Sequence, residues 1–474
     1  MRLAYFSPFP PARSGIADYS AELVPALAGH LELELFVDEG ARVDESLSAR
    51  FPVRGDRAFP ALWEAGRYDA VLYHVGNNPD FHARTWKMLQ RIPGIVVLHE
   101  AMLHHLVRGM TLAKGDLEGY AEEMRYAYGR TGEALARRSL GTGIPLDVWS
   151  YPLFERVVDA SLGLIVHNDC TGDRVRASRP GTRMVRIPHH LSLRELEEGG
   201  ASSALSPATA RAALGLPPDA FVVASFGFIT PAKRLDVALR AFARLRREVP
   251  TAVYLLVGEV SPHYDFGAIL TADLAPGVTV VGRTELDRFL LHMLAADVTI
   301  NLRYPSAGET SGTLIRLLGM GKPVIVSHTG AFSEIPDDCC AKIDLDETEE
   351  ELLAAVLLRL ATDEPLRRRM GENARRHMAT HHTLEGSARA YADFVREIAT
   401  ARPRPQTFRP VPPLAPYPPE DVFSDLAAAV AAEAADLGVG EEDTELLGAL
   451  AEVLVEFDLN SGQALDRAGS GRHA

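Results

Sequence analysis

The segment NLRYPSAGETSGTLIRLLGMGKPVIVS, residues 301–327, combines residue types that bind anions and hydroxyl groups. An apolar run ends in a polar loop, and the loop leads into a segment with helical spacing. Free backbone N–H groups of Thr310, Ser311 and Gly312 at the helix start suit a phosphate, and the Glu309 carboxylate can accept hydrogen bonds from hydroxyls. This combination indicates a sugar nucleotide. The alternative is that Glu309 only caps the helix.

Three further residues lie where an apolar run gives way to a loop. Gly15 precedes a predicted helix, where it lets the backbone approach a ligand, although such a glycine is often purely structural. His99 ends the run GIVVLHE, and Lys233 lies at the start of an amphipathic helix, where its ammonium suits a diphosphate. Structural alternatives stay open for both: a satisfied buried histidine and a solvated surface lysine.

Short apolar runs alternate with longer segments of helical periodicity, and this pattern occurs twice along the chain. Such alternation predicts parallel sheets with helical crossovers. Strands are predicted at 2–7, 31–37, 69–75, 94–100, 162–168 and 183–188, and then at 220–227, 252–258, 278–282, 297–302, 322–327 and 341–345. The sequence therefore predicts two doubly wound, Rossmann-like α/β domains that face each other across a cleft, with the ligand at the carboxyl ends of the strands.

The predicted boundaries follow shifts in composition. We expect an N-terminal domain over 1–200 and a C-terminal domain over 205–400, separated by a Ser- and Ala-rich linker. A Pro-rich linker over 401–419 follows, because eight prolines in this stretch exclude a helix. Residues 420–474 are predicted to be an acidic helical extension with a disordered tail, and a helical hairpin that packs on the body or on a protein partner is preferred to a catalytic role.

The charge and cysteine content restrict the function classes. The formal net charge of the 474 residues is −15, so a nucleic acid partner is not expected. The three cysteines show no C-x-x-C spacing, which speaks against a disulfide framework and a structural zinc site. The N-terminus forms no signal-peptide core, and no run of about 18 apolar residues occurs. We expect a cytoplasmic protein, with attachment to the inner face of a membrane left open.

With its paired α/β domains, SPFPPARSGIADYS at the start, FGFITPAKRLDVAL opening the second half and the GETSG loop, the chain resembles family-4 glycosyltransferases of the GT-B fold. The resemblance covers residues 1–400 and extends to a bacterial subgroup with a GETSG loop. It implies metal-independent, retaining transfer of a sugar from a nucleoside diphosphate sugar to an acceptor hydroxyl, on a glycan, a lipid-linked molecule or a small molecule, with no further cofactor.

The resemblance also assigns roles to residues. Lys233 matches the donor-phosphate lysine, and Glu309 matches the glutamate that contacts the donor sugar's hydroxyls. Gly15 matches the phosphate-loop glycine, and His99 matches the histidine near the donor sugar. The backbone of Thr310, Ser311 and Gly312 would complete the phosphate cradle and stabilise the departing diphosphate, whose charge grows in the transition state.

Two positions depart from the family pattern. Phe228 follows Gly227 where the family usually has an arginine that binds phosphate, and Arg316 stands near the family's second glutamate, which grips the ribose. Two interpretations of Arg316 stay open: it supplies the absent phosphate cation, or it pairs with Glu309. Phe228 and Arg316 are both still expected among the donor-binding residues, and the departures leave the donor nucleotide undetermined.

Two other functions are alternatives to a transferase. An epimerase of nucleotide sugars would share the cleft but needs carboxylates in the first domain, for which Glu100 and Asp18 are the candidates. A non-catalytic scaffold would keep the fold and dock a partner through the C-terminal extension. Membrane contact is a weaker alternative, drawn from the basic side chains within 104–138, which a solvated helical face also explains.

Overall fold

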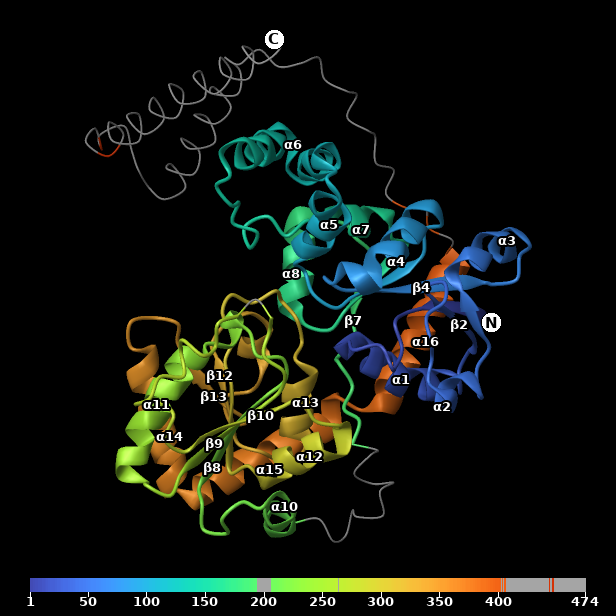
Figure 1. Ribbon diagram of the computed structural model, residues 1–474. Helices are drawn as coiled ribbons and strands as arrows, with labels where there is room; N and C mark the ends of the chain where they lie inside the picture. The colour runs from blue at the N-terminus through green and yellow to red at the C-terminus, as the bar shows by residue number, and fades with distance from the viewer. Residues whose placement is uncertain are drawn as a thin grey trace. The chain divides into compact units, whose positions relative to one another are not determined.

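The computed structural model describes residues 1–193, 206–262 and 264–401, together with four single positions further on (Figure 1). It divides into two units, Met1–Met110 with Val148–Gln406, and Thr111–Asp147 with Thr407–Ala474. The predicted linker between the domains, the Pro-rich segment and the acidic extension lie almost entirely outside the described residues.

The first unit contains two fully parallel sheets. The first has seven strands in the order β3-β2-β1-β4-β5-β6-β7, and the second has six in the order β10-β9-β8-β11-β12-β13. The strands are β1 Arg2–Phe6, β2 Glu32–Val37, β3 Val53–Gly55, β4 Ala70–Val75, β5 Ile95–Leu98, β6 Gly163–Val166, β7 Met184–Arg186, β8 Val222–Phe226, β9 Val253–Val257, β10 Val278–Gly282, β11 Val298–Asn301, β12 Val324–Ser327 and β13 Ala341–Ile343.

All twelve predicted strands are present, so the prediction of two doubly wound domains is confirmed. The strand that was not predicted is β3, which has three residues at the sheet edge and pairs with β2 through Leu35 and Val53. A strand this short carries too little apolar periodicity to be recognised in a sequence.

Helices connect the strands of both sheets (Figure 1). Their bounds are α1 Gly15–Leu27, α2 Glu45–Ser48, α3 Phe59–Glu64, α4 Pro79–Arg91, α5 His104–Met110, α7 Glu155–Ala160, α8 Asp169–Ser178, α10 Pro207–Leu214, α11 Leu235–Glu248, α12 Leu286–Ala295, α13 Gly312–Gly319, α14 Glu349–Thr362, α15 Glu364–His381 and α16 Leu384–Ala401. The apolar faces of α11 and α14 pack on one side of the second sheet, and α13 and α12 pack on the other. None of the described helices is both long and apolar enough to cross a membrane.

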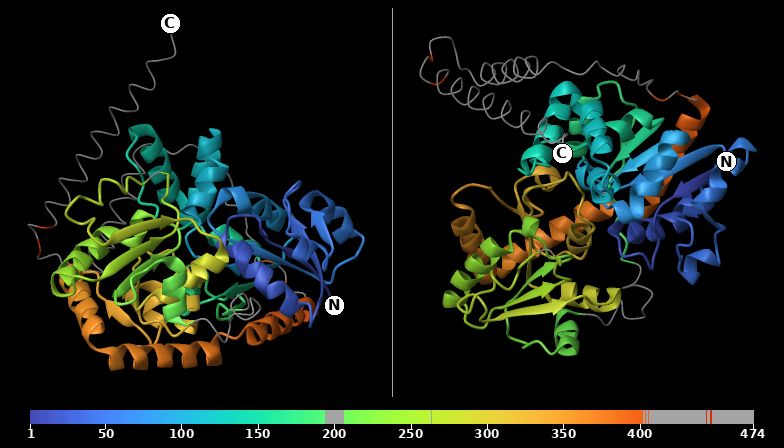
Figure 2. Two further views of the ribbon diagram at one scale, coloured as in Figure 1. Left: turned by 60° about the horizontal axis from the view of Figure 1, so that its bottom comes forward. Right: turned by 45° about the horizontal axis from the view of Figure 1, so that its top comes forward.

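Helix α16 corrects the predicted domain boundary at residue 400. Tyr391, Phe394, Val395 and Ile398 are buried with residues of the first sheet and of α1 in one hydrophobic cluster. Figure 2 shows the C-terminal helices, in orange, reaching from the second sheet to the first. The helical periodicity at 384–401 identifies an amphipathic helix but does not indicate which sheet its apolar face covers.

The described part of the second unit is a short 3-10 turn followed by α6, Leu117–Thr142. This helix is kinked at Gly129, whose φ of 66° and ψ of −151° suit glycine. Within the unit Arg137 forms ion pairs with Glu118 and Glu133 at 2.6 and 2.9 Å. The side chains of Arg137 and Glu118 are exposed and that of Glu133 is half-buried, as on a solvated helical face. Membrane contact through this segment stays a prediction.

Candidate active site

The site residues gather where the strand order of the second sheet reverses. The chain runs outward from β8 in one direction and returns to β11 on its other side, so the loops after β8 and β11 diverge at this point. In open α/β sheets such a switch point is the usual place for a ligand. Lys233 lies in the loop after β8, and Glu309 lies in the loop after β11.

The GETSG loop and the residue before it are anchored to the first domain by hydrogen bonds to their backbone carbonyl groups. The Gly308 carbonyl accepts from Asn168 Nδ2 and from Thr171 Oγ1, both at 2.8 Å. The Ala101 N–H donates to the Ala307 carbonyl at 2.9 Å. These contacts hold the carboxyl edge of the second sheet against that of the first, as the sequence predicts for two facing domains.

The loop ends in the helix start that was predicted to bind an anion. Ser311 is the N-cap of α13, and its Oγ accepts from the Leu314 N–H at 3.3 Å. The Thr310 hydroxyl accepts from Asn168 Nδ2 at 2.9 Å. Gly312 is the first helical residue, so the early N–H groups of α13 lie beside Glu309. The alternative that Glu309 only caps the helix is wrong, because the capping side chain is that of Ser311.

Lys233 is buried at the end of a 3-10 turn, Pro231–Lys233, and its Nζ donates to the Phe226 carbonyl. Burial and the nearby Arg303 guanidinium lower the pKa of Lys233 to about 7, and Glu309 acts in the opposite direction. The alternative of a solvated surface lysine is therefore excluded. A diphosphate that arrived here would favour the charged ammonium.

Glu309 forms an ion pair with Arg303, which was not predicted from the sequence. Its Oε1 lies 2.9 Å from Arg303 Nε, and its Oε2 accepts from the Ala307 N–H at 2.9 Å. Arg303 lies two residues after the end of β11, and its backbone N–H donates to Ser327 Oγ at 2.9 Å. The available signal for Arg303 was a basic residue immediately after the predicted strand 297–302.

Glu100 brings a second carboxyl group to this edge from the first domain. Its Oε1 accepts from the Asn77 N–H at 3.0 Å. Burial raises the pKa of Glu100 to about 8, and the negative charge of Glu309 adds to the effect. Glu100 is consequently protonated for the most part at pH 7. Asp18, the other carboxylate considered for the first domain, lies in the first turn of α1.

His99 follows β5 and belongs to a group of histidines around Tyr19. Its Nε2 is 2.9 Å from His74 Nδ1, and its ring meets the Tyr19 ring edge-on with 5.2 Å between centroids. Burial holds the pKa of His99 well below its usual range, and the neighbouring His167 lowers it further. His99 is therefore neutral at pH 7 and able to share hydrogen bonds, but not to supply a positive charge.

The other histidines of this group were not predicted. They are His74 in β4, His167 directly after β6, and His189 and His190 beyond β7. The side chains of His74, His167 and His190 are enclosed, and each has one ring nitrogen without a hydrogen-bond partner. The sequence feature that could have identified these histidines is their position in, or just after, an apolar strand. Within the described residues no three metal-ligating side chains come together as a metal site.

Arg316 does not pair with Glu309, so that interpretation is wrong. Its guanidinium is bound to Glu22 of α1, and the second oxygen of Glu22 lies 3.0 Å from His190 Nε2. Arg316 is thus committed to a bridge between the two domains. The reason is geometric, since the side chain leaves α13 on the face that is turned to α1.

Phe228 and Gly15 were both predicted to contact the donor. The Phe228 side chain is 50% exposed and offers a phosphate no charge. Gly15 is the first residue of α1, and its N-cap is Ser14, whose side chain accepts from the Ile16 N–H at 3.2 Å. A Cβ atom at Gly15 would meet no atom within 4 Å. The fold itself therefore does not require glycine at this position.

This gives a prediction that separates folding from ligand binding. We expect Gly15→Ala to leave the melting temperature unchanged or slightly higher, because alanine favours the helix by up to about 1 kcal/mol. If a phosphate approaches this backbone, the added methyl group weakens donor binding by tenfold or more. Calorimetry with the donor nucleotide and a thermal melt check both parts. Unchanged affinity would remove Gly15 from the donor site.

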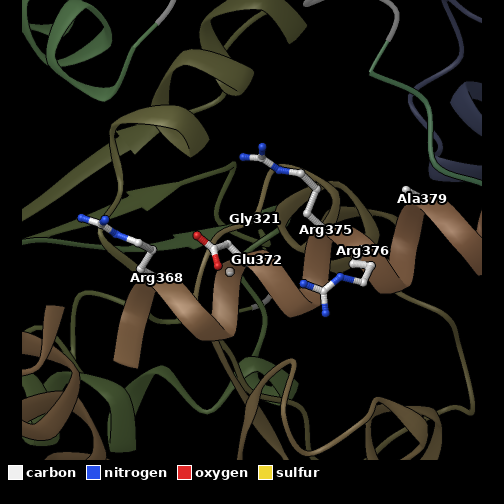
Figure 3. A pocket seen from close by; sticks show the side chains of 7 residues that line it. Gly321, Arg368, Glu372, Arg375, Arg376 and Ala379 are labelled. Atoms are coloured by element: carbon white, nitrogen blue, oxygen red, sulfur yellow. The ribbon is translucent and has the colours of Figure 1, made fainter. Parts of the chain in front are cut away.

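A separate hollow of about 530 Å³ lies on α15 and the turn at Gly321 (Figure 3). Arg368, Arg375 and Arg376 line it, but they are bound to neighbouring groups: Arg368 to Glu364 at 3.0 Å, and Arg375 to the Met320 carbonyl at 3.4 Å. The hollow contains none of the predicted site residues. We therefore place the candidate active site at the switch point and not here.

Two parallel-sheet, Rossmann-like domains define the GT-B fold class. Residues 208–377 match the family described as Glycosyl transferases group 1. Together with the fold and the curated relatives, this match indicates a GT-B glycosyltransferase of the family-4 type. The predicted resemblance to this family is thereby confirmed, while membership of the GETSG subgroup stays a prediction.

Individual proteins are similar to this chain at sequence identities below 30%. The D-inositol 3-phosphate glycosyltransferase of Salinispora arenicola is 27% identical over 243 residues, which cover 49% of this chain and 52% of the relative. The chain thus matches about half the length of this relative. Sucrose-phosphate synthase from Thermosynechococcus elongatus shares the fold with a TM-score of 0.60 at 18% identity, over 85% of this chain and all of that one. Anabaena HepE in complex with UDP and glucose gives 0.57 at 14% identity, over 84% and 100%.

Proposed function

We propose that this protein transfers a sugar from a nucleoside diphosphate sugar to an acceptor hydroxyl. The observation that carries the proposal is the convergence of Lys233, Glu309 and the N-terminus of α13 at the switch point of the second sheet. These groups match the parts of the donor: a cation and N–H groups for the diphosphate, and a carboxylate for sugar hydroxyls.

The chemistry follows from where charge develops. As the bond between sugar and diphosphate breaks, negative charge grows on the leaving phosphate, and groups already aimed at it lower the barrier. Lys233 and the N–H groups of α13 are held in place by the fold, so they need little rearrangement during the reaction. Neutral His99, on the side of the first domain, is suited to hydrogen-bond the sugar.

Retention of configuration, independence of metal and a hexose as the transferred group are parts of the same proposal, and the family resemblance supports them. For the nucleotide, UDP is the first choice because one solved neighbour is described in complex with UDP and glucose. The acceptor is a hydroxyl compound. D-inositol 3-phosphate is a reasonable first acceptor to screen, since the curated relatives are named for it.

The test is a binding panel followed by turnover. We expect one of the UDP, GDP and ADP sugars to raise the melting temperature in the presence of EDTA, because a ligand that binds only the folded state stabilises it. That donor should then support transfer, which Glu309→Ala and Lys233→Ala both abolish. If no nucleotide binds to the folded protein, the scaffold alternative is favoured.

A nucleotide-sugar epimerase is a second candidate, and Glu100 is the observation that favours it. Glu100 lies close enough to Glu309 for the charge of Glu309 to help raise the pKa of Glu100, and a pKa of about 8 suits a proton donor or acceptor. An epimerase that removes a ring proton incorporates deuterium when the donor alone is incubated in D₂O. A transferase leaves the ring protons unchanged, and mass spectrometry of the recovered donor distinguishes them.

A further inference from the structure

The bound diphosphate lacks its second cation if only the predicted residues are considered. Phe228 stands where the family has an arginine, and Arg316 is bound to Glu22 in the other domain. Lys233 alone would face a group that carries two to three negative charges. The question is therefore whether another cation lies at the switch point.

Arg303 is such a cation. It lies two residues after the end of β11, the neighbour of β8 in the sheet, and Lys233 lies in the loop after β8. The Arg303 side chain is 16% exposed, so it is largely withdrawn from solvent but not sealed off. Its charge acts on Lys233, where it helps to lower the pKa. The two cations thus share one small region, although they come from different strands.

Glu309 is the ion-pair partner of Arg303 in the structure. The two side chains are 2.9 Å apart, and Glu309 is the carboxylate that the family resemblance assigns to the sugar hydroxyls. One carboxylate cannot use the same oxygen atoms fully for both partners. In the ion pair each side chain takes the place of one part of the donor. The Glu309 carboxylate lies where a phosphate would contact Arg303, and the Arg303 guanidinium lies where sugar hydroxyls would contact Glu309.

We propose that Arg303 is the second donor-phosphate cation and that Glu309 masks it until the donor binds. The inference rests on the proposed function. Binding exchanges one ion pair for two sets of contacts: the diphosphate takes Arg303, and the sugar hydroxyls take Glu309. Because guanidinium binds phosphate oxygens in a bidentate manner, Arg303 also fixes the orientation of the leaving group.

The test is calorimetry with the sugar-free nucleotide. UDP, GDP and ADP are tried on the wild-type protein, and the one that binds is used for all variants. We expect Arg303→Gln to weaken its binding at least tenfold and Arg303→Lys to weaken it only a few-fold. Arg240→Gln is the matched control, because Arg240 is an exposed arginine of α11 that pairs with Glu350 in the same domain.

Glu309→Gln gives the more specific test, because here the predicted change in nucleotide affinity is a gain. Removal of the masking charge should strengthen binding of the sugar-free nucleotide several-fold, although turnover of the full donor is lost. The gain should vanish in the Arg303→Gln/Glu309→Gln double variant, since no masked cation is then present. Thermal melts confirm that each variant is folded.

The outcomes separate this inference from the proposed function. If the wild-type protein binds a nucleotide and Arg303→Gln binds it equally well, Arg303 is not a phosphate ligand while the proposed function stands. If Glu309→Gln brings no gain, the masking is refuted. If no nucleotide binds to the wild-type protein, the proposed function and this inference fail together.

Discussion

Lys233→Met is expected to lower the turnover of donor by at least a hundredfold and, at the same time, to raise the melting temperature. The loss follows from the removal of a cation aimed at the charge that develops on the leaving diphosphate, for which single groups contribute a factor of about 10² to 10³. Activity assays under saturating acceptor, together with thermal melts at pH 7, measure both effects.

The stability gain follows from the burial of the Lys233 ammonium. A pKa lowered from 10.5 to about 7 corresponds to a cost of the order of 4 kcal/mol at pH 7. Between about pH 7 and 10.5 the unfolded chain binds more protons than the folded one, so the stability of the wild-type protein should rise with pH in this window. Methionine removes the cost and flattens the slope. If Lys233→Met lowers both activity and the melting temperature, Lys233 stabilises the folded protein and the expected gain in stability is wrong.

The same pKa predicts how the affinity for the nucleotide depends on pH. Binding requires the charged ammonium, so the affinity is full below about pH 7 and falls up to tenfold per pH unit above it. The charged groups around Lys233 are Arg303 and Glu309. Glu100, whose pKa is about 8, acts on the same region, and its negative charge above that pH weakens nucleotide binding further. Lys233→Arg should keep only the weaker slope of Glu100.

Arg316→Leu is expected to destabilise the protein by about 3 to 5 kcal/mol. The side chains of Arg316 and Glu22 are 15% and 11% exposed, and removal of one partner leaves the Glu22 carboxylate in a largely dry place with His190 alone. Denaturant unfolding measures the effect.

A double-mutant cycle supplies the control for this bridge. The Arg316→Leu/Glu22→Leu protein should recover much of the lost stability, since apolar replacements of both partners of a buried ion pair are often neutral. If Arg316→Leu costs less than about 1 kcal/mol, the bridge behaves like an exposed ion pair and does not hold the domains together.

Much of the fold was predictable because parallel strands are buried on both faces. Runs such as VVASF in β8 are apolar throughout and bounded by polar loops, which makes their position plain. Lys233, Glu309 and the start of α13 were also predictable, because the carboxyl ends of strands converge at one edge. That these groups bind the donor stays a prediction.

What could not be predicted depends on contacts between distant parts of the chain. The partner of Arg316 is Glu22, 294 positions earlier, and no spacing rule links them. Arg303 and Glu309 are only six positions apart, but they meet because the loop between them folds back on itself through hydrogen bonds to Glu309 and Ser306. Likewise, the helical pattern of α16 does not show which sheet it covers.

Helix α16 has a consequence for the order in which the protein matures during synthesis. Its side chains complete the first domain so closely that a Cβ at Gly163 would lie 2.8 Å from Ile398 and 2.9 Å from Phe394. The first two hundred residues therefore leave the ribosome without part of their own core, and an apolar surface on α1 and the first sheet stays open until residue 398 has emerged. Dissection of the gene at the interdomain linker would yield an N-terminal fragment that needs α16 supplied in trans.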